Sequence, residues 1–357
     1  MDTIETADPL PPAKGIHCPV IGLTYNLKKG VISDLEDIEA EYDSIDTVLA
    51  IREALEALGC KVELLEADAG LLKRLAETKL DLVFNIAEGN YGRGREAQVP
   101  AILNFLKIPF VGSDETTLCI ALDKALTKRI LSTYKIKTPG YRLFSCSGSI
   151  SLKGLEFPLI VKPNAEGSSK GISDVAVVEN SGELKQLLDK NVKAYKQAML
   201  VEEYIPGREF TVALAGNDEE TVVYPPMEIK YVKSFKHNIY SFDVKKNYKE
   251  YIEYKCPSDL NPEIAKKMTA AAKKIYQVLE CKDFARIDFR LTERGEIYFI
   301  EINPLPGLAP GYSDYPMITE FMGVDYRSTI KNILNSAMKR YDMKPVMEVG
   351  GDECEGA

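Results

Sequence analysis

Two carboxylates and an amide stand inside two apolar runs, where side chains that pack a core are expected. They are Asp288, Glu301 and Asn303, in the stretch ARIDFRLTERGEIYFIEINPLPG at 285–307. The runs on either side of Arg294-Gly295 predict an antiparallel hairpin with a two-residue turn. In that register Asp288 faces Glu301. Two like charges so placed are unfavourable, and one carboxyl should stay protonated unless a cation lies between them.

The same register pairs Arg286 with Asn303 on the polar face. It leaves three apolar pairs on the other face, namely Ile287 with Ile302, Phe289 with Ile300, and Leu291 with Tyr298. Carboxylate and amide oxygens are the ligands that Mg²⁺ prefers, completed by water and substrate phosphates. The polar face therefore predicts a magnesium site. Two alternatives stay open, because the face could simply be solvated and a three-residue turn would break the pairing.

A loop of small residues, NAEGSSKGIS at 164–173, lies between two apolar stretches. Glycine and serine allow backbone N–H groups to approach an anion closely, as in phosphate-binding loops. Lys162, at the end of the preceding strand, would add a cation beside that anion. The loop lacks the helix-opening pattern of a P-loop, and a plain hairpin turn explains the same composition.

A second polar interruption, VEEYIPGRE at 201–209, follows another apolar strand. Glu202 and Glu203 stand at the strand end, where polar and backbone groups could bind an adenine ring. Glu209 could then accept the ribose hydroxyls. The alternative is a solvated turn at Pro206-Gly207.

The composition limits the classes of function. The chain has 357 residues, of which 45% are hydrophobic and 28% charged, as is ordinary for a soluble protein of two or three domains. Its net charge of −9 disfavours nucleic acids and anionic membranes as partners. Seven scattered cysteines favour reduced thiols, and two histidines leave little for a zinc site. With no signal peptide and no run of about 18 apolar residues, we expect a cytoplasmic protein.

Strand and helix patterns alternate in the first third of the chain, which predicts an α/β domain with an open parallel sheet. Strands are expected at 18–26, 61–67 and 81–89, and helices at 43–59 and 69–79, the first capped by Asp43 or Ser44. Loops at the carboxyl ends of parallel strands line a ligand crevice. The loop EGNYGRGRE at 88–96 is therefore expected at that crevice.

Two single helices are expected next, at 96–108 and 114–134. From about residue 138 the strand patterns are antiparallel in type and predict an α+β unit. Helices are expected there at 181–198, 261–281 and 326–341. We divide the chain into a flexible arm at 1–14, an N-terminal domain at 15–118, two further subdomains at 119–200 and 201–343, and an acidic tail at 344–357.

Five motifs, in this order, resemble those of the ATP-grasp enzymes, and specifically of the D-alanine–D-alanine ligase family. They are DK at 123–124, FPLIVKPNAEGSSKGIS, VEEYIPGREF, ARIDF and EINPLPGLAPGYSDYP. The resemblance extends over about residues 18–340. It implies an ATP-grasp fold behind an N-terminal βαβ domain, and ATP-dependent joining of a carboxylate to an amine.

The resemblance also implies roles for particular residues. ATP would be bound by Lys124, Lys162, Ser168 and Ser169 at the phosphates, by Glu202, Glu203 and Ile205 at the adenine, and by Glu209 at the ribose. Two Mg²⁺ ions, for which Mn²⁺ could substitute, would be held by Asp288, Glu301 and Asn303. Arg286 would stabilise the oxyanion, Ser168 would also orient the first substrate, and Gly311 and Ser313 would lie near the second.

The implied chemistry passes through an acyl phosphate, which an amine then attacks. Because an acyl phosphate hydrolyses in water, a lid is expected. The segment at 233–254, rich in Lys and Tyr, is the candidate. Catalysis would consist of positioning and charge neutralisation, with no covalent enzyme intermediate.

Departures from the family pattern fall in the amino-acid half of the site. An acidic segment at 28–44 replaces the glycine-rich loop with its catalytic glutamate. Glu39 or Glu41 could supply that group, and we carry Glu41 as the candidate. The usual His-Gly loop is replaced by one that begins at Glu88. Lys246 follows Lys245, where the family commonly has tyrosine.

Three functions remain open. The first is D-alanine–D-alanine ligation for peptidoglycan, and the second is ligation of another small amino acid or a peptide. The third is an ATP-binding regulator, which the retention of Arg286 disfavours. Lys246, Arg93 and Arg95 suggest a larger or more anionic substrate than D-alanine. The sequence is also compatible with a homodimer.

Overall fold

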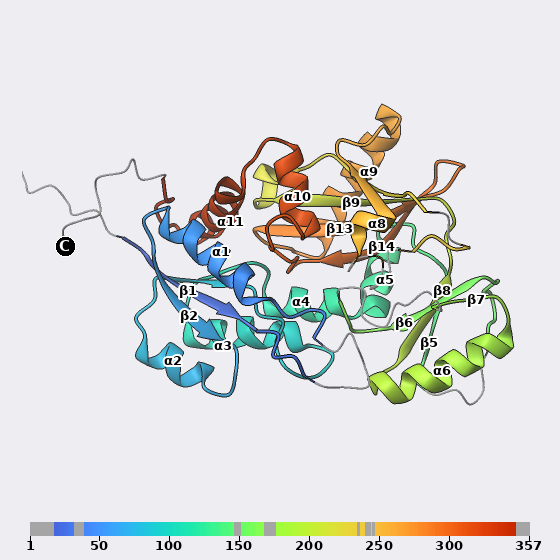
Figure 1. Ribbon diagram of the computed structural model, residues 1–357, viewed down its shortest axis with the longest axis horizontal. Coiled ribbons are helices and arrows are strands. Elements are labelled where there is room, and N and C mark those ends of the chain that lie inside the picture. Colours follow the sequence, from blue (N-terminus) through green and yellow to red (C-terminus); the bar gives the residue numbers. More distant parts are fainter. Residues whose placement is uncertain are drawn as a thin grey trace, which may run out of the picture.

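The computed structural model describes residues 18–31, 39–145, 151–167, 176–233, 236–239, 244 and 247–347. Ser168, Ser169, Lys245 and Lys246 lie outside these ranges, as do the arm at 1–14 and most of the acidic tail. Three sheets follow one another along the chain, each with its own helices (Figure 1). The division into domains at 118 and 200 stays a prediction.

The first sheet is parallel, with the strand order β2-β1-β3-β4, as the alternating pattern predicted. Its elements are β1 Val20–Tyr25, α1 Ile45–Glu56, β2 Lys61–Glu66, α2 Leu71–Glu77, β3 Leu82–Asn85, a 3₁₀ turn η1 Arg95–Ala97, α3 Gln98–Leu106 and β4 Phe110–Val111. Ser44 is the N-cap of α1, since its hydroxyl accepts from Thr47 N at 3.3 Å.

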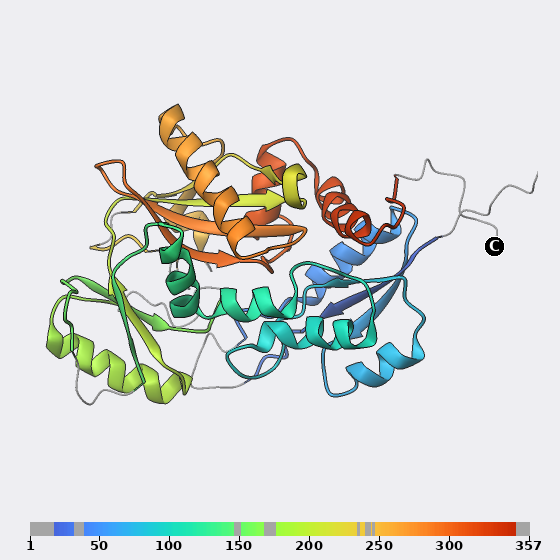
Figure 2. The same ribbon diagram turned by 180° about the vertical axis from the view of Figure 1, so that it is seen from behind.

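The stretch predicted as one helix at 114–134 is two helices, α4 Glu115–Leu122 and α5 Lys124–Thr133. Asp123 interrupts the helix because its side chain accepts from Leu126 N at 2.9 Å and caps α5. Asn164 holds this break by donating to Asp123 Oδ1 at 2.7 Å. Seen from behind, α4 and α5 run from the first sheet towards the second (Figure 2).

The second sheet is antiparallel, in the order β5-β8-β6-β7. Its elements are β5 Tyr141–Phe144, β6 Leu159–Pro163, β7 Val177–Val178, α6 Ser181–Tyr195 and β8 Met199–Glu203. Leu184 and Leu188 of α6 pack on Val161 and Val201 of the sheet. This packing leaves the ends of β6 and β8, with Lys162 and Glu202, beside α5.

The third sheet has the order β12-β11-β9-β13-β14, with β10 paired to β9. Its elements are β9 Arg208–Ala215, η2 Asp218–Glu220, β10 Val222–Val223, β11 Met227–Tyr231, α8 Tyr248–Tyr251, β12 Ile252–Lys255, α9 Pro262–Val278, β13 Phe284–Leu291, β14 Ile297–Asn303, α10 Asp314–Phe321 and α11 Tyr326–Arg340. Helix α9 covers one face of the sheet, while α11 packs against α1 of the first domain.

The hairpin β13–β14 keeps the predicted pairing only near its open end. Asp288 pairs with Glu301, and Arg286 with Asn303, as predicted. The predicted pair of Ile287 with Ile302 is also confirmed, but the two predicted pairs nearer the turn are wrong. Phe289 pairs with Phe299, Arg290 with Tyr298, and Leu291 with Ile297. Phe299, and not Ile300, therefore packs in the core.

The turn explains the difference. It has three residues and not two, since Thr292 N donates to Glu296 O at 3.0 Å and Gly295 has a φ of +78°. A bulge then inserts Ile300 opposite the step from Asp288 to Phe289. The longer turn shifts the register by one residue and the bulge shifts it back, so Asp288 still pairs with Glu301.

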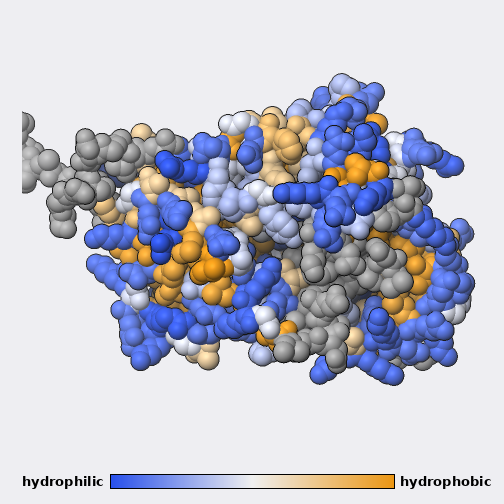
Figure 3. Space-filling model, in the orientation of Figure 1, coloured by the Kyte–Doolittle hydropathy of each residue, from blue (hydrophilic) through white to orange (hydrophobic). Residues whose placement is uncertain are grey.

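Hydrophilic side chains cover most of the rim of the face seen in Figure 3. Val346, predicted to lie in the tail, is 8% exposed and exchanges two hydrogen bonds with Asn335 of α11. Among the described helices, none is long and apolar enough to cross a bilayer.

Candidate active site

A buried cluster of two lysines and a glutamate lies between the second sheet and α5. Glu202 is 1% exposed, and its carboxylate lies 2.6 Å from Lys162 Nζ and 2.9 Å from Lys128 Nζ. Burial opposes the charge on Glu202, but the two cations outweigh it and hold its pKa at about 2. Burial lowers the pKa of Lys128 to about 8. Sequence reasoning missed Lys128, although it lies one helical turn after Lys124.

Two lysines, one from α5 and one from β6, face a carboxylate of the third sheet. Lys124, the first residue of α5, has its Nζ 3.5 Å from Glu301 Oε2 and donates to Glu166 O. Burial opposes the charge on Lys162, but Glu202 and Glu301 outweigh it and raise its pKa. Lys124 and Lys162 thus face Glu301 across the gap between two sheets. A polyphosphate in this gap would have its negative charge neutralised by the lysines on one side and by cations held at Glu301 on the other.

Asp288 and Glu301 share their negative charge unequally. Burial raises the pKa of Asp288 to about 7, an effect that Arg286 opposes and Glu301 increases. Burial also opposes ionisation of Glu301, yet Lys124 and Lys162 outweigh it and lower the pKa of Glu301. One carboxyl of the pair therefore holds its proton more tightly, as the predicted pairing of like charges requires.

The same pair has oxygen atoms to offer a metal. Asp288 Oδ1 is buried and accepts no hydrogen bond from the described residues. Asn303 Oδ1 accepts from Leu305 N at 3.0 Å, which leaves it one lone pair. Two carboxylates and an amide form a hard donor set that fits Mg²⁺. In the described part of the chain, no three His, Cys, Asp or Glu side chains form a complete metal site, so phosphate or water would have to add ligands.

Arg286 links this pair to the neighbouring cavity. It is 8% exposed, donates to Asp314, and lies 3.3 Å from Asp288 Oδ2. Asp314, 3% exposed, is the first residue of α10, a short helix that sequence reasoning missed together with the role of this acid. The two carboxylates fix the guanidinium between the hairpin and the loop before α10.

The predicted nucleotide hinge joins β8 to β9. Glu203 N donates to Gly140 O at 2.9 Å, and Glu203 Oε2 accepts from Gly140 N at 3.0 Å. This carboxylate therefore holds the hinge to the start of β5. Ile205 is 8% exposed and apolar, as the wall of an adenine site would be.

Glu209, the predicted ribose ligand, lies on β9 beside an arginine that sequence reasoning missed. Its Oε2 accepts from Tyr231 OH at 2.7 Å and from Arg290 at 3.1 Å. The Arg290 guanidinium stacks on the Tyr204 ring at 5.1 Å and donates to Asn238 O, in the predicted lid, at 2.9 Å. The predicted hinge, Glu209 and the predicted lid are thus connected through Arg290.

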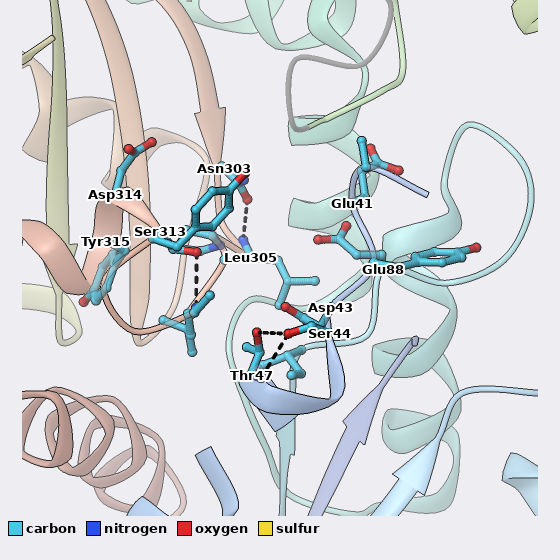
Figure 4. Close-up of a pocket in the computed structure, with 18 of the residues that line it drawn as sticks. Glu41, Asp43, Ser44, Thr47, Glu88, Asn303, Leu305, Ser313, Asp314 and Tyr315 are labelled. Atoms are coloured by element: carbon cyan, nitrogen blue, oxygen red, sulfur yellow. Dashed lines mark hydrogen bonds between the residues drawn. The ribbon is translucent and has the colours of Figure 1, made fainter. Parts of the chain in front are cut away.

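A cavity of about 380 Å³ lies beside Arg286, between the first domain and the loop at 305–313. Glu88 and Asp43 point into it from one side and Ser313 lies on the other (Figure 4). Ser313 Oγ accepts from Ala309 N at 3.1 Å, which fixes the loop. Gly311, predicted to lie near the substrate, is outside this lining, and its carbonyl accepts from Tyr248 OH at 3.1 Å.

Comparisons with known proteins agree on one family. A family model described as D-ala D-ala ligase C-terminus matches residues 147–335. The D-alanine–D-alanine ligase of Aquifex aeolicus is 35% identical over 82% of this chain and 94% of the relative. This chain belongs to the D-alanine–D-alanine ligase family. It is thus a ligase that forms C–N bonds.

Solved structures of the family show the same fold. The D-alanine–D-alanine ligase of Bacillus anthracis, complexed with ATP, has a TM-score of 0.72 at 22% identity and covers 92% of this chain and 99% of that one. The VanG D-Ala:D-Ser ligase of Enterococcus faecalis has a TM-score of 0.69 at 21% identity, over 90% of this chain and 100% of that one.

The structure separates the two candidates for the ligase family's N-terminal glutamate. Glu41 is 9% exposed and lines the cavity, and it accepts from Arg95 and from Gly167 N, directly before Ser168. Glu39 instead accepts from the backbone of the loop at 29–31 and does not line the cavity. The geometry therefore favours Glu41.

Two of the three cations that suggest a more anionic substrate are ion-paired within the chain. Arg95 is 6% exposed, and besides Glu41 it pairs with Glu166 at 3.2 Å. Arg93 pairs with Asp123 at 3.0 Å. Neither arginine lines the cavity, and Lys246 lies outside the described residues.

The described part of the predicted lid reaches Glu179, directly after β7 of the second sheet. Lys236 and His237 lie 2.8 Å and 2.7 Å from Glu179 Oε1. Val244, 3% exposed, packs with Ile229 and Ile252 of the third sheet. The described residues of this segment thus contact both the second and the third sheet, and its role as a lid stays a prediction.

Proposed function

We propose that this chain is an ATP-dependent ligase that joins the carboxyl group of one small amino acid of the D-alanine type to the amino group of another. The observation that carries the proposal is the convergence of Lys124 and Lys162 with Asp288 and Glu301, next to Arg286 and the cavity. With D-alanine as both substrates, the product would be the dipeptide used in peptidoglycan.

In the first step, ATP would lie between the second and third sheets, with its adenine at the hinge and its phosphates on Lys124 and Lys162. A substrate carboxylate attacks the γ-phosphorus, and the bond from that phosphorus to ADP breaks. The products are an acyl phosphate and ADP. The lysines stabilise the charge that moves to the leaving ADP.

In the second step, the neutral amine of the other substrate attacks the acyl carbon. The bond to phosphate breaks, phosphate leaves with the electron pair, and the attacking nitrogen loses a proton. Arg286 would donate to the oxyanion that forms on the acyl carbon, and Asp314 would hold it in position. Glu41 and Ser313 would contact the substrates from opposite sides of the cavity.

Magnesium belongs to the same proposal. Asp288, Glu301 and Asn303 would hold one or two Mg²⁺ ions, for which Mn²⁺ could substitute. When bound, the metal would supply charge neutralisation for the phosphates. The unpartnered oxygen of Asp288 supports this assignment.

Phosphate release by the purified chain, with ATP, Mg²⁺ and D- or L-alanine, tests the proposal, with mass spectrometry of the product. We expect D-alanine-dependent phosphate release and a dipeptide. Arg286→Lys should lower kcat on the order of 10²-fold with an unchanged KM for ATP, because a point charge replaces the planar donor. Exposed Arg327→Lys on α11 is the matched control. ATP hydrolysis that no amino acid stimulates would contradict the proposal.

A further inference from the structure

Arg290 continues a row of charged side chains along β13. Side chains two residues apart on a strand point to the same face, so Arg286, Asp288 and Arg290 share one face, while Ile287 and Phe289 pack in the core on the other. Two residues of a strand span about 6.8 Å. Arg290 therefore lies one step beyond the carboxylate that would hold the metal, in the direction away from Arg286. It is only 4% exposed.

Three neighbouring strands bring Arg290 to Glu209 and Tyr231. Arg290 is the direct partner of Glu209 across β13 and β9, and Ile229 is its partner across β9 and β11, two residues before Tyr231. Opposite charges in such cross-strand positions stabilise each other. Glu209 Oε2 accepts from Arg290 Nη1 at 3.1 Å and from Tyr231 OH at 2.7 Å. Burial and the neighbouring carboxylate raise the pKa of Tyr231, so its hydroxyl stays a donor.

The two oxygens of the Glu209 carboxylate differ in their contacts. Both donors bind Oε2, whereas Oε1 accepts no hydrogen bond from any residue that the structure describes. The side chain is 14% exposed, so water reaches it from few directions. A carboxylate can accept about four hydrogen bonds. Oε1 is therefore the acceptor that remains for the hydroxyl groups of a ligand.

The remaining contacts of Arg290 fix the plane of its guanidinium. Nη2 donates to Gly207 O at 3.1 Å, Nη1 donates to Asn238 O at 2.9 Å, and the group stacks on the Tyr204 ring at 5.1 Å. These partners are uncharged, and Glu209 is the one carboxylate that Arg290 meets in the described part of the chain. A guanidinium held in this way orients the carboxylate, which a freely rotating ammonium would not do.

We propose that Arg290 is a positioning residue of the nucleotide site, which holds Glu209 Oε2 so that Oε1 stays available to the ribose hydroxyls of ATP. Arg290 then acts through Glu209 and needs no contact with the nucleotide. It determines how strongly the site prefers a nucleotide with ribose hydroxyls to one without them. The inference rests on the proposed function, because ATP is the ligand.

The test compares the binding of ADP and 2′,3′-dideoxy-ADP with Mg²⁺ present. The second nucleotide has the same base and phosphates but lacks both hydroxyls that could donate to Glu209. Isothermal titration calorimetry gives the Kd of each without an amino acid, so the measurement does not depend on turnover. The wild type should bind ADP about tenfold more tightly, the size expected for one hydrogen bond to a charged acceptor.

Arg290→Met should weaken ADP about tenfold and the dideoxy nucleotide less than about twofold, so that the preference disappears. Arg290→Lys keeps the charge without the planar fork and should keep part of the preference. Tyr231→Phe removes the other donor to Oε2 and should reduce the preference less than Arg290→Met does. Arg294→Met, at an exposed arginine in the turn of the same hairpin, is the control and should match the wild type. Thermal unfolding shows whether each variant folds, and Arg290→Lys and Tyr231→Phe decide if Arg290→Met does not.

A double variant tests whether Arg290 acts through Glu209. Arg290→Met should weaken ADP by less than about twofold when Glu209→Ala is already present. Equal weakening of both nucleotides in the Arg290 variants would give Arg290 a purely structural role and overturn the inference. A full preference in those variants, or none in the wild type, would overturn it too. A wild type that prefers ADP but shows no amino-acid-dependent turnover would contradict the proposed ligase activity alone, and the loss of preference in Arg290→Met would still support the role of Arg290.

Discussion

Glu202 contacts other groups in the structure than the one that its position in the sequence predicts. Its place at the strand end predicts contact with an adenine amino group, and that role stays a prediction. In the structure both carboxylate oxygens face lysines, at 2.6 Å from Lys162 and 2.9 Å from Lys128. Glu202 therefore fixes the lysine that would meet the phosphates. Without it, two buried ammonium groups would repel each other.

The carboxylates of the hairpin give the prediction at this scale. Asp288→Asn or Glu301→Gln should lower turnover by at least about 10²-fold at saturating Mg²⁺, because each removes a charged ligand from a hard cation. The fold should persist, since neither change alters core volume. Steady-state kinetics over a range of Mg²⁺ concentrations, with thermal unfolding in parallel, measures both effects. The control is Glu296→Gln, a half-exposed acid on the same hairpin. Wild-type turnover in either variant would rule out the metal assignment.

At the scale of elements, apolar periodicity predicted most strands and helices, and the misses have local causes. The helix at 114–134 breaks because Asp123 caps the next turn, a choice that depends on its bond to Asn164, far away in sequence. The hairpin register followed from the apolar pattern only at its open end. Near the turn, Gly295 allows a left-handed third residue, which the pattern cannot distinguish from a two-residue turn.

Gly295 provides the prediction for this element. Gly295→Ala places a side chain on backbone with a φ of +78°, so it should lower the free energy of unfolding by about 1 kcal/mol. Catalytic constants should hardly change, because the turn lies at the far end of the hairpin from Asp288. Urea unfolding with matched kinetics measures both quantities. Gly154→Ala, at a φ of +81° in a different loop, is a comparison at a site with open space. A loss of activity without a loss of stability would contradict this division of roles.

At the scale of the whole molecule, the site is assembled from ion pairs that join distant parts of the chain. Glu41 reaches Arg95, Lys124 reaches Glu301, and Asp314 reaches Arg286, and none of these pairings could be predicted from the sequence. Motif order predicts ATP-binding and metal residues because each motif is a short local pattern, and these assignments stay predictions. The cavity is different, because its charge balance depends on which acids have been paired elsewhere. Arg93 and Arg95 in the loop at 88–96 are paired with Asp123, Glu41 and Glu166, so their number alone does not give the charge of the cavity.

The pKa of Asp43, which lines the cavity, can be measured without knowledge of the substrate. Its pKa of about 7 in the folded protein exceeds the value of about 3.9 for an unfolded aspartate. Between these values the folded state binds the extra proton, so the stability that this group contributes is present below about pH 4 and is lost as the pH rises through 7. The titratable groups that act on or respond to Asp43 are Lys28, Glu88 and Tyr326.

Asp43→Asn removes this titration. Relative to the wild type, its free energy of unfolding should rise by up to a few kcal/mol between pH 4 and 8, most steeply below pH 7. Urea unfolding at pH 5, 6, 7 and 8 measures the difference, with Glu53→Gln as the control expected to stay parallel to the wild type. Parallel stability curves for Asp43→Asn and the wild type would mean that Asp43 is already ionised and solvated in the folded protein.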